Sequence, residues 1–433
     1  MRLAGPEARN VALPLLRLAG GKLELEPQHA HYAELMDPES GERLDEVVVT
    51  FFAAPHSYTT DDVIEISCHG SPVLLGRVVE LALAKGVRMA DPGEFTMRAF
   101  LNARIDLTQA EAVRDLIESQ TLYQAKVAAQ QLGGSVSRRM QPIKQQLVNL
   151  IAVLEAGIDF ADDDVSVLPA EDTLQLIAEI RAPLVKLQEG FAFGKVVRGG
   201  FTLAIVGRPN VGKSSLFNRL VERDRAIVTA TPGTTRDLVT ETVSLGGIPV
   251  HLIDTAGIRE ALDEAESLGI TKSREAMADA DLVLVVVDAH ANGSRELDEQ
   301  LIAAAAERSA IVVENKIDLG RPSSETALKF PALRTSALTG EGIAELREEI
   351  LRVVSGVSGR EESGFLTNLR QYQLVTDALS ALASAEHAIH QHTPHEMVLM
   401  DLYNTLRPLD DITGITTTDD ILNLIFSTFC IGK

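Results

Sequence analysis

Gly207-Arg-Pro-Asn-Val-Gly-Lys-Ser214 is the stretch that decides the fold, because it fits the G-x-x-x-x-G-K-[ST] phosphate-loop pattern. The mostly apolar run Phe201–Val206 before it predicts a buried parallel strand, and residues 215–220 after it predict the start of a helix. Strand, loop and helix in this order present backbone N–H groups and a helix N-terminus to phosphates. The pattern alone fits ATPases and GTPases, and a Gly-rich turn with a solvated lysine is the plain alternative.

The loop and the segment after it suggest a magnesium site. Lys213 is expected to reach the β- and γ-phosphates, and the Ser214 hydroxyl is expected to bind Mg²⁺. Residues 231–237, Thr-Pro-Gly-Thr-Thr-Arg-Asp, form a turn-rich segment that suits a mobile switch. Thr235 in that segment would complete the Mg²⁺ shell when the γ-phosphate is present.

A second motif follows the apolar run 250–253. Asp254 of Asp254-Thr-Ala-Gly257 would hold Mg²⁺ through water, and the Gly257 N–H would meet the γ-phosphate. Ras-like GTPases place a water-orienting glutamine directly after this motif, whereas this chain has Ile258. Any of four nearby acidic residues could position water instead, although a solvated acidic loop explains most of them: Glu260, Asp263, Glu264 and Glu266.

Two later motifs indicate that the base is guanine. Asn315-Lys-Ile-Asp318 follows the apolar run 311–313, and the run 282–287 predicts another buried strand before it. The Asp318 carboxylate can accept two hydrogen bonds from the guanine N1–H and amino group, which adenine cannot supply. A backbone N–H in Ser336-Ala-Leu338 would meet the guanine O6. Five motifs in this order, each at a strand end, predict a GTP-binding domain.

Length and composition limit the classes of protein to which this chain can belong. The chain has 433 residues, enough for two or three domains, and its 45% hydrophobic content supports proper cores. A net charge of −22 argues against a surface that binds nucleic acid throughout, but not against a local basic patch. Two distant cysteines, Cys68 and Cys430, fit a reduced cytosolic protein. No apolar run of 18 residues and no signal-peptide pattern occur, so we expect a cytoplasmic protein without a membrane span.

The pattern along the chain predicts a multidomain α/β protein. We expect a small α+β domain over residues 1–103, with strands at 47–52, 63–66 and 86–89 and a helix at 72–84. A helical domain over 104–198 would be interrupted by a P-loop (Ras-like) α/β GTPase domain over 199–354 and would resume over 355–433. One helical stripe should lie in its core, at i, i+3, i+4 and i+7: Leu147, Leu150, Ile151 and Leu154.

The chain resembles the MnmE (TrmE) family of tRNA-modification GTPases over nearly its whole length. Besides the GTPase motifs, the resemblance is carried by Asp91-Pro-Gly-Glu-Phe-Thr96, Arg98-Ala-Phe-Leu-Asn102, Asp106-Leu-Thr-Gln-Ala-Glu-Ala112, Ile158-Asp-Phe160 and Phe429-Cys-Ile-Gly-Lys433. It implies a homodimer that acts on tRNA with an FAD-dependent partner. That complex adds an aminomethyl or carboxymethylaminomethyl group to carbon 5 of the wobble uridine.

The resemblance also implies two ligand sites. Arg2, Glu65, Arg104 and Lys433 would lie at a formyl-tetrahydrofolate pocket, although surface basic residues and a strand glutamate are the ordinary reading. The family usually has lysine at the Arg104 position, which keeps the charge but not necessarily the geometry. A potassium ion would replace the missing glutamine and stabilise charge between the β- and γ-phosphates. Its ligands would be Asn210, Thr229, Thr231 and Thr234.

With the resemblance, Glu266 becomes the residue expected to orient the attacking water, and Lys213 and Glu266 the catalytic pair. Asn210 also has a plain reading as a turn former. The residues expected to contact GTP are Asn210, Val211, Gly212, Lys213, Ser214, Ser215, Thr229, Ala230, Thr231, Pro232, Gly233, Thr234, Thr235, Asp254, Thr255, Ala256, Gly257, Asn315, Lys316, Ile317, Asp318, Ser336, Ala337 and Leu338.

One departure from the family concerns the amino end, where members usually carry an extra strand before the segment matching residues 2–5. A missing strand would leave an unpaired sheet edge and weaken the case for folate binding and dimerisation. Two other functions stay open: a GTP-dependent assembly factor that binds ribosomes or RNA, and a switch-like GTP-binding module whose shortened first domain no longer supports catalysis. Co-purification with a flavoprotein, co-sedimentation with ribosomal subunits and folate binding distinguish the three.

Overall fold

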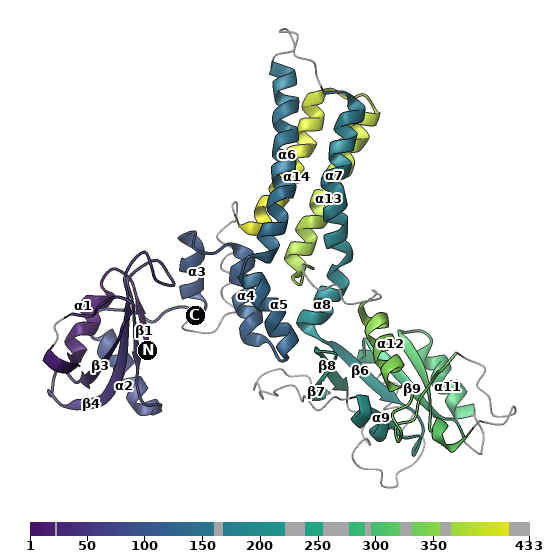
Figure 1. The fold of residues 1–433 in the computed structure, drawn as a ribbon, viewed down its shortest axis with the longest axis horizontal. Helices are drawn as coiled ribbons and strands as arrows, with labels where there is room; N and C mark the ends of the chain where they lie inside the picture. The colour runs from purple at the N-terminus through teal and green to yellow at the C-terminus, as the bar shows by residue number, and fades with distance from the viewer. Residues whose placement is uncertain are drawn as a thin grey trace. The chain divides into compact units, whose positions relative to one another are not determined.

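The computed structural model describes residues 1–21, 24–159, 168–220, 239–253, 277–290, 296–320, 331–355 and 365–414. The chain divides into two compact units, and Figure 1 labels the elements of both. The first unit contains Met1–Arg114, Gln131–Ser137 and Asp410–Lys433, and the second contains Asp115–Gln130 and Arg138–Leu409. In the described part of the chain, no helix is both long and apolar enough to cross a membrane.

The first unit is built on a five-stranded antiparallel sheet in the order β1-β5-β4-β3-β2. Hydrophobic residues alternate along its strands, so one face of the sheet packs against α1 and α2 and forms the core of this part. The elements are β1 (Arg2–Ala4), α1 (Ala8–Ala12), η1 (Leu13–Leu15), β2 (Leu16–Leu18), η2 (Ala19–Gly21), β3 (Ala30–Met36), β4 (Arg43–Phe52), β5 (Val63–Ser67) and α2 (Pro72–Leu83).

The strand expected at residues 86–89 is wrong. Residues 84–86 form a turn and residues 87–90 have no regular structure. Arg88 in this stretch donates from both terminal guanidinium nitrogens to Glu94, at 2.9 and 2.6 Å. Arg88 also donates to the Met89 carbonyl at 2.9 Å, so its contacts hold this irregular segment against the start of the next helix.

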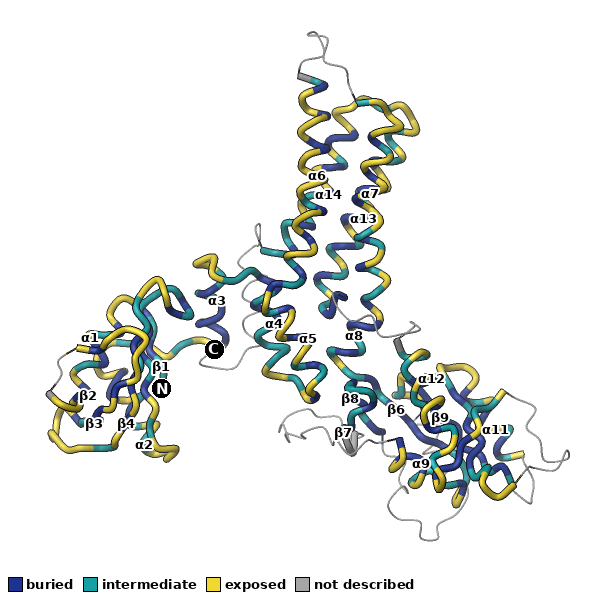
Figure 2. The backbone as a smooth tube through the Cα atoms, viewed as in Figure 1, coloured by how far each residue is buried: buried dark blue, intermediate teal, exposed yellow. Residues whose placement is uncertain are grey.

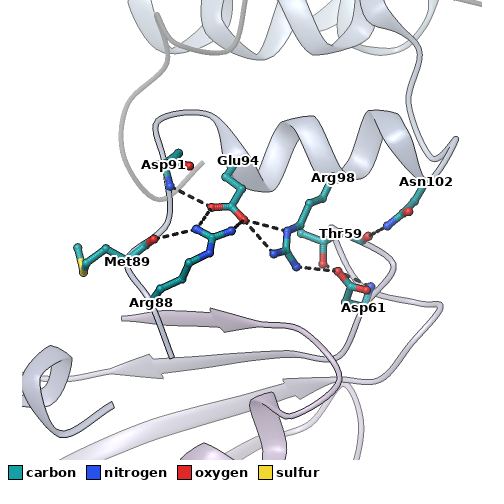
Figure 3. A network of polar contacts seen from close by, with 8 residues as sticks. All are labelled: Thr59, Asp61, Arg88, Met89, Asp91, Glu94, Arg98 and Asn102. Atoms are coloured by element: carbon teal, nitrogen blue, oxygen red, sulfur yellow. Dashed lines mark hydrogen bonds and ion pairs between the residues drawn. The ribbon is translucent and has the colours of Figure 1, made fainter. Parts of the chain in front are cut away.

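That helix, α3 (Glu94–Leu101), begins in a network of charges centred on the buried carboxylate of Glu94 (Figure 3). Glu94 accepts hydrogen bonds from Arg88, from Arg98 at 2.9 and 3.1 Å and from the Asp91 N–H at 2.9 Å. Arg98 also pairs with Asp61, 3.3 Å away. The hydrogen bonds from Arg88, opposed by burial, lower the pKa of Glu94 from 4.5 to about 2. The Asp91–Thr96 motif thus has a structural role at this helix start.

A second motif of the same part caps α4 (Leu107–Glu118). One carboxylate oxygen of Asp106 accepts from the Gln109 N–H at 2.9 Å and the Thr108 hydroxyl at 2.6 Å. The other oxygen accepts from the Ser137 hydroxyl at 2.5 Å. Asp106 therefore satisfies the helix start and fixes it to a segment thirty residues further along.

Long helices occupy the regions before and after the nucleotide-binding segment. They are α5 (Leu122–Leu132), α6 (Ser135–Asp159), α7 (Ala170–Glu189), α13 (Leu369–His390) and α14 (His395–Thr413). Helices α7 and α13 pack along one another, and Arg181 pairs with Glu386 across them at 3.0 Å. Buried positions recur along the helices in Figure 2, and the stripe from Leu147 to Leu154 is buried as predicted. The exact domain boundaries stay a prediction.

The second unit contains a six-stranded sheet in the order β11-β10-β9-β6-β8-β7, parallel except for the antiparallel pair β7–β8. Its strands are β6 (Phe201–Val206), β7 (Val239–Leu245), β8 (Ile248–Ile253), β9 (Leu282–Asp288), β10 (Ala310–Asn315) and β11 (Leu333–Arg334). Its helices are α8 (Phe191–Gly199), α9 (Lys213–Leu220), α11 (Glu296–Ala305) and α12 (Ile343–Ser355), with η3 at Ile317–Leu319. The multidomain fold class predicted from the sequence is confirmed.

Helices α8 and α5 pack against the strands and the turn of this sheet. Phe193 and Val197 of α8 lie in the same hydrophobic core as β6 and β8. The buried amide of Gln124 donates to the carbonyls of Val197 and Arg198 at 3.0 and 2.8 Å, and the Thr121 hydroxyl donates to Gly247 O at 2.6 Å. The β7–β8 turn is thus fixed to α5.

The Glu94 network generates a prediction about stability and pH. Glu94→Gln should lower the free energy of unfolding of the first unit by about 2 kcal/mol, because charge-assisted hydrogen bonds to two arginines weaken. The pKa is depressed in the folded state, so the stabilisation is present above pH 4.5 and is lost as the pH falls toward 2. Chemical denaturation between pH 7 and 3 measures both effects.

Glu80→Gln is the matched control, because Glu80 is exposed and pairs with Arg77 on one helix at 3.2 Å. Surface pairs contribute little, so this variant should stay within about 0.5 kcal/mol of the wild type. Equal stability losses in the two variants would contradict the role assigned to Glu94.

Candidate functional site

The phosphate loop leaves the carboxyl end of β6 and enters α9. Gly207 has φ 153°, and a Cβ there would lie 2.2 Å from the Val286 carbonyl oxygen, so only glycine fits. The Lys213 ammonium donates to the carbonyl oxygens of Gly207 at 2.9 Å and Arg208 at 2.8 Å. Burial lowers the pKa of Lys213. A negative charge beside it, such as that of a phosphate, would have the opposite effect and favour its protonated form. Ser214 and Ser215 lie in the first turn of α9.

Asn315 joins the guanine motif to the phosphate loop. Its side chain is buried, and its amide nitrogen donates to the Val211 carbonyl at 3.0 Å. Its amide oxygen accepts from the Ala337 N–H at 3.0 Å. A Cβ on Gly212 would lie 2.4 Å from the same Asn315 nitrogen. The Asn315 amide therefore fixes the loop and the segment 336–338 at once.

Lys316 makes a second connection of the same kind. Its ammonium donates to the Asn210 carbonyl at 2.6 Å and to Asp288 at 2.7 Å. Both Lys316 and Asn210 have positive φ, 68° and 64°, a conformation that favours glycine and that asparagine tolerates better than lysine. One hydrogen bond therefore joins two residues that both have left-handed backbone conformations.

Asp318, the predicted base-reading carboxylate, lies beside the segment 336–338. One of its oxygens accepts from the Ser336 hydroxyl at 2.6 Å, and that hydroxyl accepts from the Thr339 N–H at 3.1 Å. Arg219 of α9 donates to the carbonyls of Ala337 and Leu338 at 3.0 and 2.8 Å. Ile317 lies between Lys316 and Asp318 in η3. The structure thus places the loop, the guanine motif and residues 336–338 together at the carboxyl edge of the parallel strands.

Several predicted site residues lie outside the described residues, so their positions stay predictions. These are Thr229, Ala230, Thr231, Pro232, Gly233, Thr234, Thr235, Asp254, Thr255, Ala256, Gly257, Glu266 and Lys433. Of the two proposed Mg²⁺ ligands the structure describes Ser214, and of the four proposed K⁺ ligands it describes Asn210.

Two acidic residues at the site were missed by the sequence reasoning. Asp288 ends β9 and binds Lys316, and Asp298 of α11 binds Arg208 of the loop through two hydrogen bonds of 2.8 Å. Burial opposes ionisation of Asp288, but hydrogen bonds from Lys316 and the His290 N–H hold its pKa below the ordinary value. Asp288 follows an apolar run, as Asp254 does, and that shared pattern could have identified it in the sequence. No local pattern marks Asp298.

The described residues of the proposed folate site make two separate sets of contacts. Arg2 and Glu65 lie on adjacent strands β1 and β5 and form an ion pair of 2.6 Å. The Arg2 guanidinium also lies 5.6 Å from the centre of the Phe95 ring. Arg104 lies 5.4 Å from the centre of the Tyr58 ring. The structure therefore brings Arg2 and Glu65 together and places an aromatic ring beside each arginine.

The site and fold can be compared with known proteins. Two family models match: the MnmE helical domain over residues 107–430 and the GTP-binding protein TrmE N-terminus over residues 1–104. The chain is 82% identical to the tRNA modification GTPase MnmE of Koribacter versatilis (strain Ellin345), over 100% of this chain and 95% of that protein. It is 43% identical to the tRNA modification GTPase MnmE of Aquifex aeolicus (strain VF5), over 95% of this chain and 92% of that protein.

Among solved structures, the chain is similar to the G domain of the T. maritima FeoB iron transporter. The two are 29% identical, with a TM-score of 0.26, over 35% of this chain and 98% of that one.

The contacts of Asp318 predict a change of base specificity. Asp318→Asn should weaken GTP binding by 100-fold or more, about 3 kcal/mol, because an amide cannot accept from both guanine donors. The same variant should bind xanthosine triphosphate, whose 2-oxo group accepts from the new amide. Competition against a fluorescent GDP analogue measures both affinities.

Asp281→Asn serves as the control, because Asp281 accepts from Thr202 at the opposite end of β9. It should keep the wild-type preference for GTP. Retention of GTP preference by Asp318→Asn would show that Asp318 does not read the base.

Proposed function

The chain belongs to the MnmE family of tRNA modification GTPases, and from that membership we propose that it is a K⁺-stimulated, Mg²⁺-dependent GTP hydrolase that drives wobble-uridine modification. With an FAD-dependent partner it would add an aminomethyl or carboxymethylaminomethyl group to carbon 5 of that uridine. The working form would be a homodimer that joins the partner in a heterotetramer in the cytoplasm. The observation that supports GTP as the ligand is the double connection of Asn315 and Lys316 to the phosphate loop.

The phosphate loop has features that favour binding of a nucleoside triphosphate. Gly207 and Gly212 allow the Val286 carbonyl and the Asn315 amide to approach the loop more closely than a Cβ would permit, and this packing sets the course of the loop backbone. Lys213 places a partly buried ammonium beside the loop carbonyls. When phosphates bind, Lys213 would exchange those carbonyls for the β- and γ-oxygens. The Ser214 hydroxyl at the start of α9 would be one Mg²⁺ ligand, with Thr235 proposed as a second.

A potassium ion fits the same loop at Asn210. K⁺ would supply positive charge where negative charge develops between the β- and γ-phosphates. Asn210 is exposed and its backbone is fixed by Lys316, so its amide oxygen starts from a defined loop conformation. Thr229, Thr231 and Thr234 are proposed to complete the ligand set, and Glu266 to orient the attacking water.

A folate is proposed to bind beside the amino-terminal sheet. A glutamate can accept hydrogen bonds from the amino group and ring N–H of a pterin. Glu65 forms an ion pair with Arg2, and Arg2 lies beside Phe95. Arg104 and Lys433 would add positive charge for the carboxylates of the ligand. Formyl-tetrahydrofolate would supply the one-carbon unit that reaches the uridine.

The potassium requirement is tested by hydrolysis rates in KCl and NaCl of equal ionic strength. We expect at least about tenfold faster hydrolysis in KCl, equivalent to about 1.4 kcal/mol of transition-state stabilisation. Asn210→Gly should lose this ratio, because it keeps the positive φ and removes the amide oxygen. Equal wild-type rates in the two salts would refute the potassium proposal.

The biological role is tested by mass spectrometry of tRNA nucleosides from cells with and without the gene. We expect unmodified wobble uridine to accumulate without the gene, and the wild-type copy to restore the modified form. Normal wobble uridines together with co-sedimentation of the protein with ribosomal subunits would favour an assembly factor instead.

A further inference from the structure

The end of β9 supports the segment that carries the guanine motif. Asp288 is paired in register with Asn315 of β10, the neighbouring parallel strand. The next residue, Ala289, donates its N–H to the Asn315 carbonyl at 2.9 Å. The Nε2 of His290 lies 3.0 Å from the Gly320 carbonyl oxygen, which requires the tautomer protonated at Nε2. Residues 288–290 therefore contact the segment 315–320 near both of its ends.

Among these contacts, the one made by Asp288 is an ion pair. One carboxylate oxygen accepts from Lys316 at 2.7 Å and the other accepts from the His290 N–H at 2.9 Å. Lys316 in turn donates to the Asn210 carbonyl at 2.6 Å. A flexible lysine side chain has many rotamers, and fixing it in one of them costs entropy. The Asp288 carboxylate offsets that cost by holding the ammonium within reach of the loop.

We propose that Asp288 is a positioning residue, which acts through Lys316 to hold the guanine motif and the Asn210 turn of the phosphate loop in one arrangement. The base end and the phosphate end of the nucleotide site are then fixed to one another before either part of a nucleotide arrives. Removal of the Asp288 charge frees Lys316, and the Asn210 carbonyl loses a short charge-assisted hydrogen bond. Bound nucleotide should then leave faster, because the loop can open without breaking that bond.

A consequence for hydrolysis rests on the proposed function. If Asn210 binds K⁺, a loosened Asn210 turn should need a higher K⁺ concentration for half-maximal hydrolysis. The dissociation rate of a nucleotide measured in NaCl does not involve K⁺, so it tests the positioning role separately.

The decisive experiment is a double-mutant cycle on nucleotide release. The dissociation rate of a fluorescent GDP analogue is measured in NaCl for the wild type, Asp288→Asn, Lys316→Met and the double variant. Asp288→Asn should release the analogue about tenfold faster, a coupling of the size found for contacting charges. In the Lys316→Met background the same substitution should have almost no further effect, because Asp288 acts through Lys316.

Asp281→Asn, at the other end of β9, is the control and should release the analogue at the wild-type rate. Thermal unfolding of every variant separates local from global effects, since a general loss of stability would not depend on the residue at position 316. Wild-type release from Asp288→Asn, or purely additive effects in the double variant, would overturn the proposal. A wild type indifferent to K⁺ would refute the potassium part of the proposed function, and the release rates would still decide the role of Asp288.

Discussion

The rest of the site depends on the hydrogen bonds that Asn315 and Lys316 donate to the carbonyls of Val211 and Asn210. Strands β6, β9 and β10 are parallel, so their carboxyl ends meet at one edge and bring residues a hundred positions apart into contact. Because the Asn315 amide is buried, the loss of either partner leaves a polar group unsatisfied at a cost of about 1–3 kcal/mol. Base recognition and phosphate binding are consequently parts of one structure.

The phosphate loop is also held from its other side. The Arg208 guanidinium forms two hydrogen bonds with Asp298, which is almost completely buried at the start of α11. A buried carboxylate without its partner is strongly destabilising, so this pair restricts where the loop can lie. Between these two connections, the Lys213 ammonium donates a hydrogen bond to a carbonyl of the loop itself, and burial lowers its pKa. These contacts therefore fix the conformation of the loop before a phosphate binds.

Much of this arrangement could be predicted from the sequence, because apolar runs followed by polar motifs mark strand ends. The strands before Gly207 and Asn315 and the buried stripe at Leu147 follow from such local patterns. The strand expected at residues 86–89 did not form: the chain turns at 84–86, and Arg88 binds Glu94 at the start of the next helix. Alternating apolar residues in so short a stretch do not distinguish a strand from an irregular connection. The partners of Lys316 and Arg208 depend on strand register and on helix packing, so both pairings emerge only from the three-dimensional structure. Asp288 itself follows an apolar run and could have been noticed in the sequence, whereas Asp298 could not.

The central claim is that the guanine motif shapes the phosphate loop even without a nucleotide. Hydrogen exchange of the backbone amides of residues 208–215 tests it most directly, compared between the nucleotide-free wild type and Asn315→Ala. Faster exchange in 208–215, with unchanged exchange in β6, is the result that the structure predicts. Unchanged exchange throughout the loop would contradict the claim.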